Sequence, residues 1–199
     1  MTEPDEIRTN LQDGTPVLLR PVRSGDKERF VEGLKLLSME SRYLRFFAPV
    51  LELTDKQLAF LTEVDQDMHV AWGALDPTAP EFPGFGVARY VRLDEDPTTA
   101  EVAVAVIDEM HRHGLGSLLL GLLYVLASRA GVRVFRGTIV PANRFLIEWA
   151  RGLGANVRYS DGVYRVDVPV LKDPGEFPKG QEGDNFRLIV EKIRALLSP

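Results

Sequence analysis

The sequence contains no cysteine among its 199 residues. Disulfide bonds, thiolate metal ligands and a cysteine nucleophile are therefore all excluded. The sequence also has no excess of basic residues, because 24 Lys and Arg stand against 29 Asp and Glu, for a net charge of -5. This balance provides no polybasic surface, so we expect a protein that binds neither nucleic acid nor an anionic membrane.

Long hydrophobic runs are absent as well. The longest, from Leu115 to Ala127, is shorter than the roughly 20 residues that a helix needs to cross a bilayer. The first ten residues, MTEPDEIRTN, are acidic and polar, which does not fit a secretory signal. With 45% hydrophobic and 27% charged residues, the composition is typical of a globular protein. We expect a cytoplasmic protein.

The first part of the chain predicts one strand and three helices. PVLLRPV, residues 16–22, has the pattern of a short strand. Ser24 is a candidate N-cap for a helix that continues to about Leu37, and Ser38 and Thr54 are candidate N-caps for two more. Gln57 follows Thr54 at the spacing of a capping box.

The rest of the chain predicts a mixed, mostly antiparallel sheet flanked by helices, an α/β (α+β) fold. Asp161-Gly162 is a hairpin turn signal between the last two strands. The expected strands are 68–76, 84–93, 100–108, 132–140, 155–160 and 163–170, the first three of them antiparallel, and the expected helices are 114–130 and 142–153.

A linker rich in Pro and Gly starts at Leu171 and leads to an amphipathic segment, residues 185–197. We therefore expect one domain over residues 1–170, followed by a linker and helix over residues 171–199. The apolar face of that helix either packs on the domain or forms a subunit contact. Both a monomer and a homodimer stay open.

The stretch HRHGLGSLLL places two glycines, Gly114 and Gly116, at the start of a helix after a strand that ends at Ile107. A helix N-terminus has unpaired N–H groups and the positive end of the helix dipole, so it attracts anions. A tight turn without a ligand is the alternative. The Walker A lysine is absent, and Leu119 replaces the third glycine of the dinucleotide fingerprint.

VAVIDEMHRHGLGSLLL, followed about thirty residues later by VPANRFLIEWARGLGA, resembles the GNAT acyltransferase family. The first stretch is similar to the family's acyl-CoA pyrophosphate loop and the second to its Asn-bearing helix. The resemblance implies a GNAT fold over about residues 17–170. LSMESRYLRFF, from Leu37 to Phe47, and the pair GVARYVR and AEVAVAV are similar to segments of bacterial GNAT protein lysine acetyltransferases.

The resemblance implies acetyl-CoA as co-substrate and an amine acceptor, with a protein lysine as one candidate. The backbone of Val104 would bind the thioester oxygen and that of Val106 the pantetheine arm. Asn143 would contact the pantetheine or the far end of the cofactor, and a helix N-cap is its alternative. The pyrophosphate would bind at His111, Arg112, His113, Gly114, Leu115, Gly116 and Ser117.

Two departures from the family pattern concern this site. His111 and His113 replace the usual Gln or Arg and Arg or Lys, so cofactor affinity is expected to rise from pH 8 to pH 6, where histidine takes up a proton. Ala150 stands where many members carry a tyrosine general acid, and we assign no acid. Tyr124 is expected in the core.

An amine acceptor needs a base, because a free lysine with a pKa of about 10.4 is almost fully protonated at pH 7. By resemblance, Glu101 matches the glutamate base of the lysine acetyltransferases. Strand alternation places it with Ala103 and Ala105 on one face and the intervening valines on the other. The alternative is an ordinary edge glutamate bonded to a neighbouring strand.

Several other readings of the sequence stay open. The acceptor could bind along a helix that carries Glu40, Arg42, Tyr43, Arg45, Phe46 and Phe47, or that helix could simply be a partly buried amphipathic one. Asp108, His111 and His113 lie close in sequence but have no further ligand beside them, so no metal is expected. A small amine acceptor, or a non-catalytic CoA-binding domain, are alternative functions.

Overall fold

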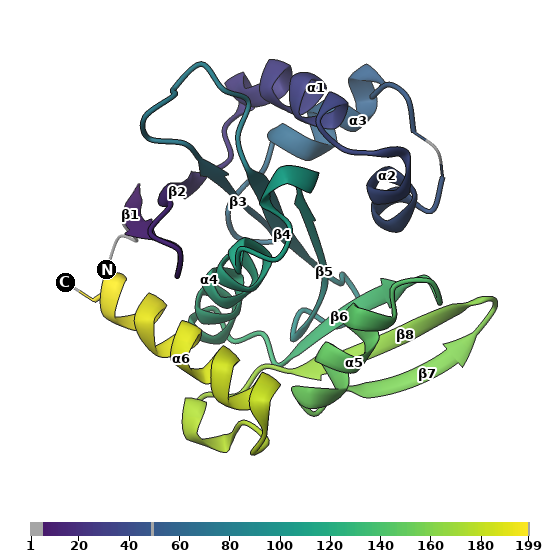
Figure 1. Cartoon of the computed structure of the whole chain (residues 1–199). Helices are drawn as coiled ribbons and strands as arrows, with labels where there is room; N and C mark the ends of the chain where they lie inside the picture. Colours follow the sequence, from purple (N-terminus) through teal and green to yellow (C-terminus); the bar gives the residue numbers. More distant parts are fainter. Residues whose placement is uncertain (1–5, 49, 199) are drawn as a thin grey trace. The chain divides into compact units, whose positions relative to one another are not determined.

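The computed structural model describes residues 6–48 and 50–198, so the first five residues of the polar N-terminus lie outside it. The described strands form one sheet in the order β1-β2-β3-β4-β5-β6-β8-β7 (Figure 1). The strands are β1 (Ile7–Asn10), β2 (Pro16–Pro21), β3 (His69–Leu75), β4 (Gly86–Arg92), β5 (Thr99–Val106), β6 (Val134–Ile139), β7 (Asn156–Ser160) and β8 (Val163–Pro169).

Six α-helices and three short 3-10 turns complete the described part of the chain. The α-helices are α1 (Lys27–Lys35), α2 (Met39–Phe46), α3 (Asp55–Thr62), α4 (Leu115–Arg129), α5 (Arg144–Gly152) and α6 (Gln181–Leu196). The 3-10 turns are η1 (Ser24–Asp26), η2 (Asp108–Met110) and η3 (Pro174–Glu176).

The sheet is mixed, as predicted. β5 and β6 are parallel, whereas β1 with β2, β2 with β3, β6 with β8, and β7 with β8 are antiparallel. β3, β4 and β5 are neighbours in the predicted order. The predicted fold class is therefore confirmed. The chain divides into two compact units, the described part of Met1–Arg89 with Val104–Leu120, and Tyr90–Ala103 with the described part of Gly121–Pro199.

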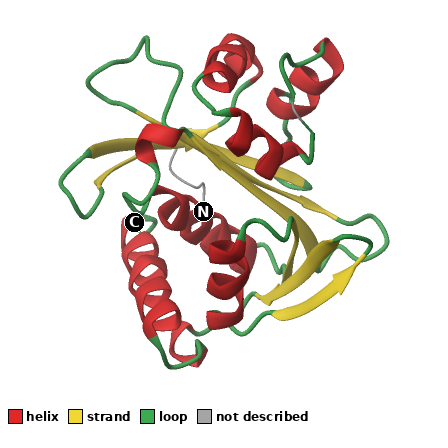
Figure 2. Ribbon diagram, turned by 45° about the vertical axis from the view of Figure 1, so that its right-hand side comes forward, coloured by secondary structure: helices red, strands yellow, loops and turns green. Residues whose placement is uncertain are grey.

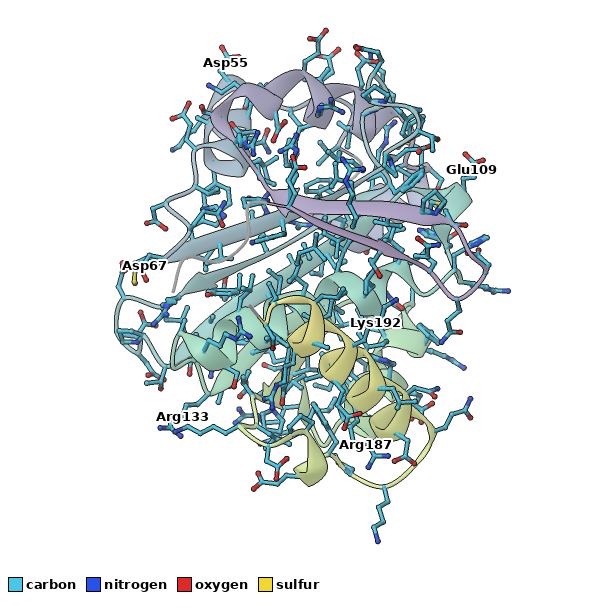
Figure 3. All side chains as sticks on the ribbon, turned by 90° about the vertical axis from the view of Figure 1, so that its left-hand side faces the viewer. Asp55, Asp67, Glu109, Arg133, Arg187 and Lys192 are labelled. Atoms are coloured by element: carbon cyan, nitrogen blue, oxygen red, sulfur yellow. The ribbon has the colours of Figure 1, made fainter. Side chains whose placement is uncertain are left out.

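In the first unit, α1 and α3 pack against each other (Figure 1). Two of the three predicted helix caps are confirmed. Ser38 Oγ accepts the N–H of Ser41 at 3.1 Å, and Thr54 forms the full capping box with Gln57. Asp55, which follows Thr54, directs its carboxylate outward (Figure 3).

The predicted N-cap at Ser24 is wrong. A 3-10 turn occupies residues 24–26, and α1 begins only at Lys27. The reason is Asp26, whose carboxylate accepts the N–H of Arg23 at 2.8 Å and two hydrogen bonds from Arg20, at 2.6 and 2.8 Å. Burial raises the pKa of Asp26, but these donors outweigh it and hold the pKa below its ordinary value.

The sequence patterns also missed β1. This edge strand pairs with β2 from Ile7↔Leu19 to Asn10↔Pro16. It is short and mostly polar, and among its residues only Ile7 is buried, so alternating hydrophobicity does not reveal it. The signal that could have found it is Asp13-Gly14, a turn dipeptide in which Gly14 has a φ of 89°.

In the second unit, the predicted hairpin between β7 and β8 is confirmed (Figure 2). Asp161 and Gly162 both have positive φ, 54° and 82°, as a tight hairpin turn requires. α5 packs against both strands of this hairpin. On the same side of β6, the rings of Tyr124 and Phe135 meet edge to face at 6.1 Å between centroids.

Tyr124 is in the core, as predicted, with 1% of its surface exposed. Its hydroxyl donates to the carbonyl of Pro169 at 3.1 Å and accepts the N–H of Leu171 at 2.6 Å. Burial raises its pKa to about 12. The hydroxyl is therefore a neutral structural group at any ordinary pH.

α6 starts at Gln181, four residues before the predicted segment. Its apolar face carries Phe186, Val190 and Ile193, all buried, and the ring of Phe186 contacts those of Tyr124 and Trp149. Figure 3 shows α6 with Arg187 and Lys192 along it. The division of the chain into domains at residue 170 stays a prediction.

None of the helices in residues 6–48 and 50–198 combines the length and the apolar character that crossing a bilayer requires.

Close packing of α4 against α6 can be tested at Gly121. A Cβ there would lie 2.5 Å from Ile189 Cγ2, whereas a Cβ at Gly33 in α1 would meet nothing within 4 Å. We expect Gly121→Ala to lower the free energy of unfolding by about 1–3 kcal/mol through overpacking. Gly33→Ala should raise it by about 0.5–1 kcal/mol, the helix-propensity gain alone. Urea denaturation of both variants gives the comparison, and equal effects would contradict the proposed packing.

Candidate functional site

The loop between β5 and α4 is shaped by two residues in the left-handed region. Arg112 has a φ of 66° and Gly114 a φ of 81°. The helix follows at once, and its first regular bond runs from the Leu118 N–H to the Gly114 carbonyl at 3.0 Å. The N–H groups of residues 115–117 precede that bond, so they have no acceptor within the helix. The loop residues 111–114 are exposed, so the turn has the geometry that an anion site needs, and anion binding there stays a prediction.

The two glycines of this turn have different reasons to be glycine. Gly114 needs its freedom because of its positive φ. Gly116 has no such φ, and a Cβ on it would meet only Val106 Cγ2 at an ordinary 3.9 Å. The fold itself therefore does not demand glycine at 116. Close approach of a ligand to the backbone gives a reason for it.

His111 does not extend toward a ligand. Its Nε2 lies 2.9 Å from the carbonyl oxygen of Val106, and since a carbonyl only accepts, Nε2 must carry the hydrogen. The same nitrogen is 3.9 Å from Asp108 Oδ1. The side chain thus folds back on the end of β5, and one acceptor position of the Val106 carbonyl is already in use.

His113 is also engaged. Its Nδ1 lies 2.6 Å from Asp13 Oδ2, and Asp13 belongs to the turn between β1 and β2 that the sequence patterns missed. The hydrogen bond from His113, with a further one from the Thr15 N–H, lowers the pKa of Asp13 to about 2. The Asp13 carboxylate therefore partly neutralises any positive charge on His113. The structure gives Arg112 no ion pair within the described residues, so it is the loop's uncompensated cation.

Asp108 links this loop to α2. Its Oδ2 accepts the N–H of Ser38, the cap of α2, at 3.2 Å. Its neighbour Glu109 points outward from η2 (Figure 3). In the described part of the chain no three His, Asp or Glu side chains are placed to hold a metal ion, so Asp108, His111 and His113 do not form a ligand set there.

Glu101 lies in the second unit, at the last pair of the described β5–β6 register, opposite Arg136. Arg136 Nε donates to Asp167 at 2.8 Å, and this hydrogen bond raises the pKa of Arg136. Glu101 itself is exposed and makes no hydrogen bond or ion pair among the described residues. The alternative of an edge glutamate bonded to its neighbour is therefore not what the structure has, and the role as base stays a prediction.

Asn143 has the geometry of a helix N-cap, which is the alternative that the sequence left open. It is the N-cap of α5, and its Oδ1 accepts the N–H of Leu146 at 3.2 Å. Its contact with the cofactor stays a prediction. Because Oδ1 already accepts the Leu146 N–H, the side-chain NH₂ group would make that contact. Ala150 is buried, and no general acid is assigned.

The helix proposed for acceptor binding is α2, in which Met39, Glu40 and Tyr43 are exposed and the other residues are half-buried. Met39, Tyr43 and Phe47 have 50%, 47% and 43% of their surface exposed. Arg42 is committed to structure, because it donates to the carbonyls of Leu37 and Val50. No residue of α2 is fully buried, so α2 is an amphipathic helix with an open aromatic face.

Two comparisons decide the family. The chain is 31% identical over 152 residues to an acetyltransferase of Pseudomonas aeruginosa, PA5475, covering 76% of this chain and 81% of that protein. It is 29% identical to the GNAT domain of S. lividans PAT, with a TM-score of 0.75 over 82% of this chain and 96% of that one. The chain belongs to the GNAT family of N-acetyltransferases. The resemblance read from the sequence is thereby confirmed.

Longer GNAT proteins are similar too. Acetyltransferase Pat of Mycolicibacterium smegmatis is 37% identical over 172 residues, which are 84% of this chain and 48% of that protein. The chain thus spans about half the length of this relative. A cAMP-binding acyltransferase from Mycobacterium smegmatis is 30% identical, with a TM-score of 0.61 over 98% of this chain and 56% of that one. A scan against protein-family models found no match.

A more distant GNAT neighbour shows the same fold. This acetyltransferase from Salmonella typhimurium, solved with its cofactor acetyl-CoA, is 18% identical, with a TM-score of 0.59 over 83% of this chain and 98% of that one. At that identity the likeness concerns the fold alone.

The contact between Asp13 and His113 predicts how the GNAT cofactor loop responds to charge. Removing the carboxylate in Asp13→Asn removes a negative charge that lies beside the loop, 2.6 Å from His113 Nδ1. We expect CoA to bind about 2-fold to 5-fold tighter, the size of an exposed charge pair. Titration calorimetry measures this.

The matched control for this change is Asp76→Asn. Asp76 also accepts a backbone N–H two residues on, from Thr78 at 2.8 Å, and loses the same charge, but it lies in the loop after β3. Equal gains in the two variants would show a general charge effect and contradict a role for the contact with His113.

Proposed function

We propose that the chain transfers an acetyl group from acetyl-CoA to a primary amine, with a protein lysine side chain as the acceptor. The observation that carries this proposal is the left-handed turn before α4, whose first N–H groups face an exposed loop. Family membership supports the reaction type, and the acetyl-CoA bound to the Salmonella typhimurium neighbour supports the co-substrate. The segments similar to lysine acetyltransferases and the net charge of -5 favour a cationic acceptor.

The chain's own groups fit the pyrophosphate of CoA. The N–H groups of Leu115, Gly116 and Ser117 would donate to it, and the N-terminal end of the α4 dipole adds to the attraction. Arg112 supplies the side-chain cation. The two histidines contribute less than the sequence suggests, because one is bonded to Val106 and the other to Asp13.

The backbone of β5 would hold the reactive end of the co-substrate. Acetyl-CoA supplies the acetyl group in thioester-activated form. The N–H of Val104 would polarise the thioester carbonyl, and Val106 would bind the pantetheine arm as an added strand does. The Val106 carbonyl already accepts a hydrogen bond from His111. The N–H of Val106 would therefore be the main group that binds the pantetheine arm.

Glu101 would remove a proton from the acceptor amine, directly or through one water molecule. Its exposure and its lack of a hydrogen-bond partner among the described residues favour this role. Arg136 lies opposite on β6 and interacts with Glu101 through its charge, but its guanidinium donates its hydrogen bond to Asp167. A thiol with a pKa near 8.5 leaves as thiolate without a dedicated acid, which suits a site with Ala150 at the family's tyrosine position.

The proposed base is tested by Glu101→Gln. We expect the transfer rate to fall by about 100-fold or more, because a positioned base contributes that much, while CoA affinity stays the same. Glu95→Gln, an exposed acid in the turn between β4 and β5, is the control and should keep full rate. Thiol release and calorimetry give rate and affinity, and a wild-type rate in Glu101→Gln removes Glu101 from this role.

The acceptor and the two alternative functions need a separate experiment. Mass spectrometry of a lysate incubated with the protein and labelled acetyl-CoA should find the label on protein lysines. Label on small metabolites alone would favour a metabolite acetyltransferase. CoA binding without any thiol release across a broad amine panel would favour a non-catalytic CoA-binding domain.

A further inference from the structure

Asp167 of β8 is a carboxylate shared by two arginines. Arg136 Nε on β6 donates to Asp167 Oδ1 at 2.8 Å, and Arg158 Nη2 on β7 donates to Asp167 Oδ2 at 3.2 Å. Asp167 is the most buried of the three side chains, with 21% of its side-chain surface exposed. Both oxygens of this carboxylate are therefore in use.

Arg136 has a second acidic neighbour, Glu101. The registers of the sheet pair Arg136 with Glu101 on β5 and with Asp167 on β8. Paired residues of adjacent strands project from the same face of a sheet, and their strands lie about 4.8 Å apart. Glu101, Arg136 and Asp167 thus form a row across three neighbouring strands in the second unit (Figure 1), with the arginine between the two carboxylates.

Arg136 donates its hydrogen bonds to only one of these two carboxylates. Its Nη2 lies 3.5 Å from Asp167 Oδ2, so the contact with Asp167 has two points, the arrangement that binds a guanidinium to a carboxylate most specifically. Glu101 is exposed and accepts no hydrogen bond in the described part of the chain. The hydrogen bond to Asp167, and more weakly the charge of Glu101, raise the pKa of Arg136. Glu101 and Arg136 therefore interact without being bonded.

The other charged side chains close to this row have partners. Asp96, whose charge also acts on Arg136, accepts the hydroxyl hydrogens of two threonines at 2.7 and 2.6 Å. Arg165, on the same face of β8, pairs with Asp161 at 3.6 Å. Arg92 on β4 donates to two backbone carbonyls. Of these charged groups, the Glu101 carboxylate alone has no bonded partner within the described residues.

We propose that Asp167 is a positioning residue for the transfer reaction. By binding Arg136 it keeps the guanidinium away from Glu101, so that the Glu101 carboxylate stays free to take a proton. This inference rests on the proposed function, because it uses Glu101 as the base. A carboxylate bonded to a cation is a weaker base than a free one, since the cation favours the charged form.

The proposed positioning is tested by Asp167→Asn. This variant keeps a hydrogen-bond acceptor but loses the charge that holds Arg136, so the guanidinium is free to turn to Glu101. We expect the maximal transfer rate to fall by about 3-fold to 5-fold at low salt, the size of a partly exposed charge pair, while CoA affinity stays the same. The loss should shrink at high salt, because exposed charge pairs are screened. Thiol release and calorimetry measure rate and affinity.

Asp161→Asn is the matched control. Asp161 lies in the turn of the β7–β8 hairpin, pairs with one arginine as Asp167 does, and loses the same charge in this change. Asparagine tolerates the positive φ of this position as aspartate does. The register places Arg165, the arginine that is released, opposite Thr138, so the wild-type rate is expected. Equal losses of rate in the two variants would show a general charge effect and overturn the proposal.

A second substitution separates positioning from simple structural support. When Asp167→Asn is combined with Arg136→Gln, no guanidinium is left opposite Glu101, and we expect most of the lost rate to return. A protein that is merely damaged by the loss of Asp167 would not regain its rate when Arg136 is removed as well. A double variant without rescue therefore overturns the proposal, as does a wild-type rate in Asp167→Asn alone.

The NMR signal of the Glu101 side-chain carboxyl carbon gives a readout that needs no acetyl transfer. This signal should move in Asp167→Asn, when Arg136 binds Glu101, and should return in the double variant. A signal that does not move would overturn the proposal. Failure of the proposed function has a different signature, which is a wild-type rate in Glu101→Gln together with a carboxyl signal that still moves in Asp167→Asn.

Discussion

The left-handed turn at Arg112 and Gly114 is the constraint on which the candidate cofactor site depends. It leads the chain from η2 through the exposed residues 111–114 into the N-terminus of α4. In the proposed site, main-chain N–H groups and Arg112 would hold the anion. The two histidines are bonded elsewhere, one to the Val106 carbonyl and one to Asp13.

Much of this architecture could be predicted because its causes are local. The Thr54 capping box, the Asp161-Gly162 hairpin and the glycine loop each depend on residues within a few positions of one another. The predicted N-cap at Ser24 was wrong because Asp26, two residues later, accepts hydrogen bonds from Arg20 of the preceding strand and sets the start of the helix instead. The partners of His113 and Arg89 could not be predicted, because they lie far away in the sequence. Asp13 is 100 residues from His113, and the ring of Phe30 meets Arg89 only in the folded chain.

Buried arginines are treated in two different ways in this chain. Arg20 is neutralised by Asp26 and closes the start of α1, so it acts purely as structure. Arg89 is held by a carbonyl, a neutral imidazole and two rings, so no carboxylate among the described residues offsets its charge. Burial therefore lowers the pKa of Arg89, whereas the hydrogen bond to Asp26 raises that of Arg20.

The hydroxyl of Tyr124 has a consequence for how the C-terminal part of the chain opens. It holds Pro169 and Leu171 to α4 at the point where the sheet ends and the segment toward α6 begins. Detaching α6 with that segment would leave a buried phenol without its partners, at the cost that any unpaired buried polar group carries. Amide hydrogen exchange at Leu171 should thus be slow for a residue outside regular structure and should follow the opening of α4. The segment after β8 and the helix α4 are therefore expected to open together.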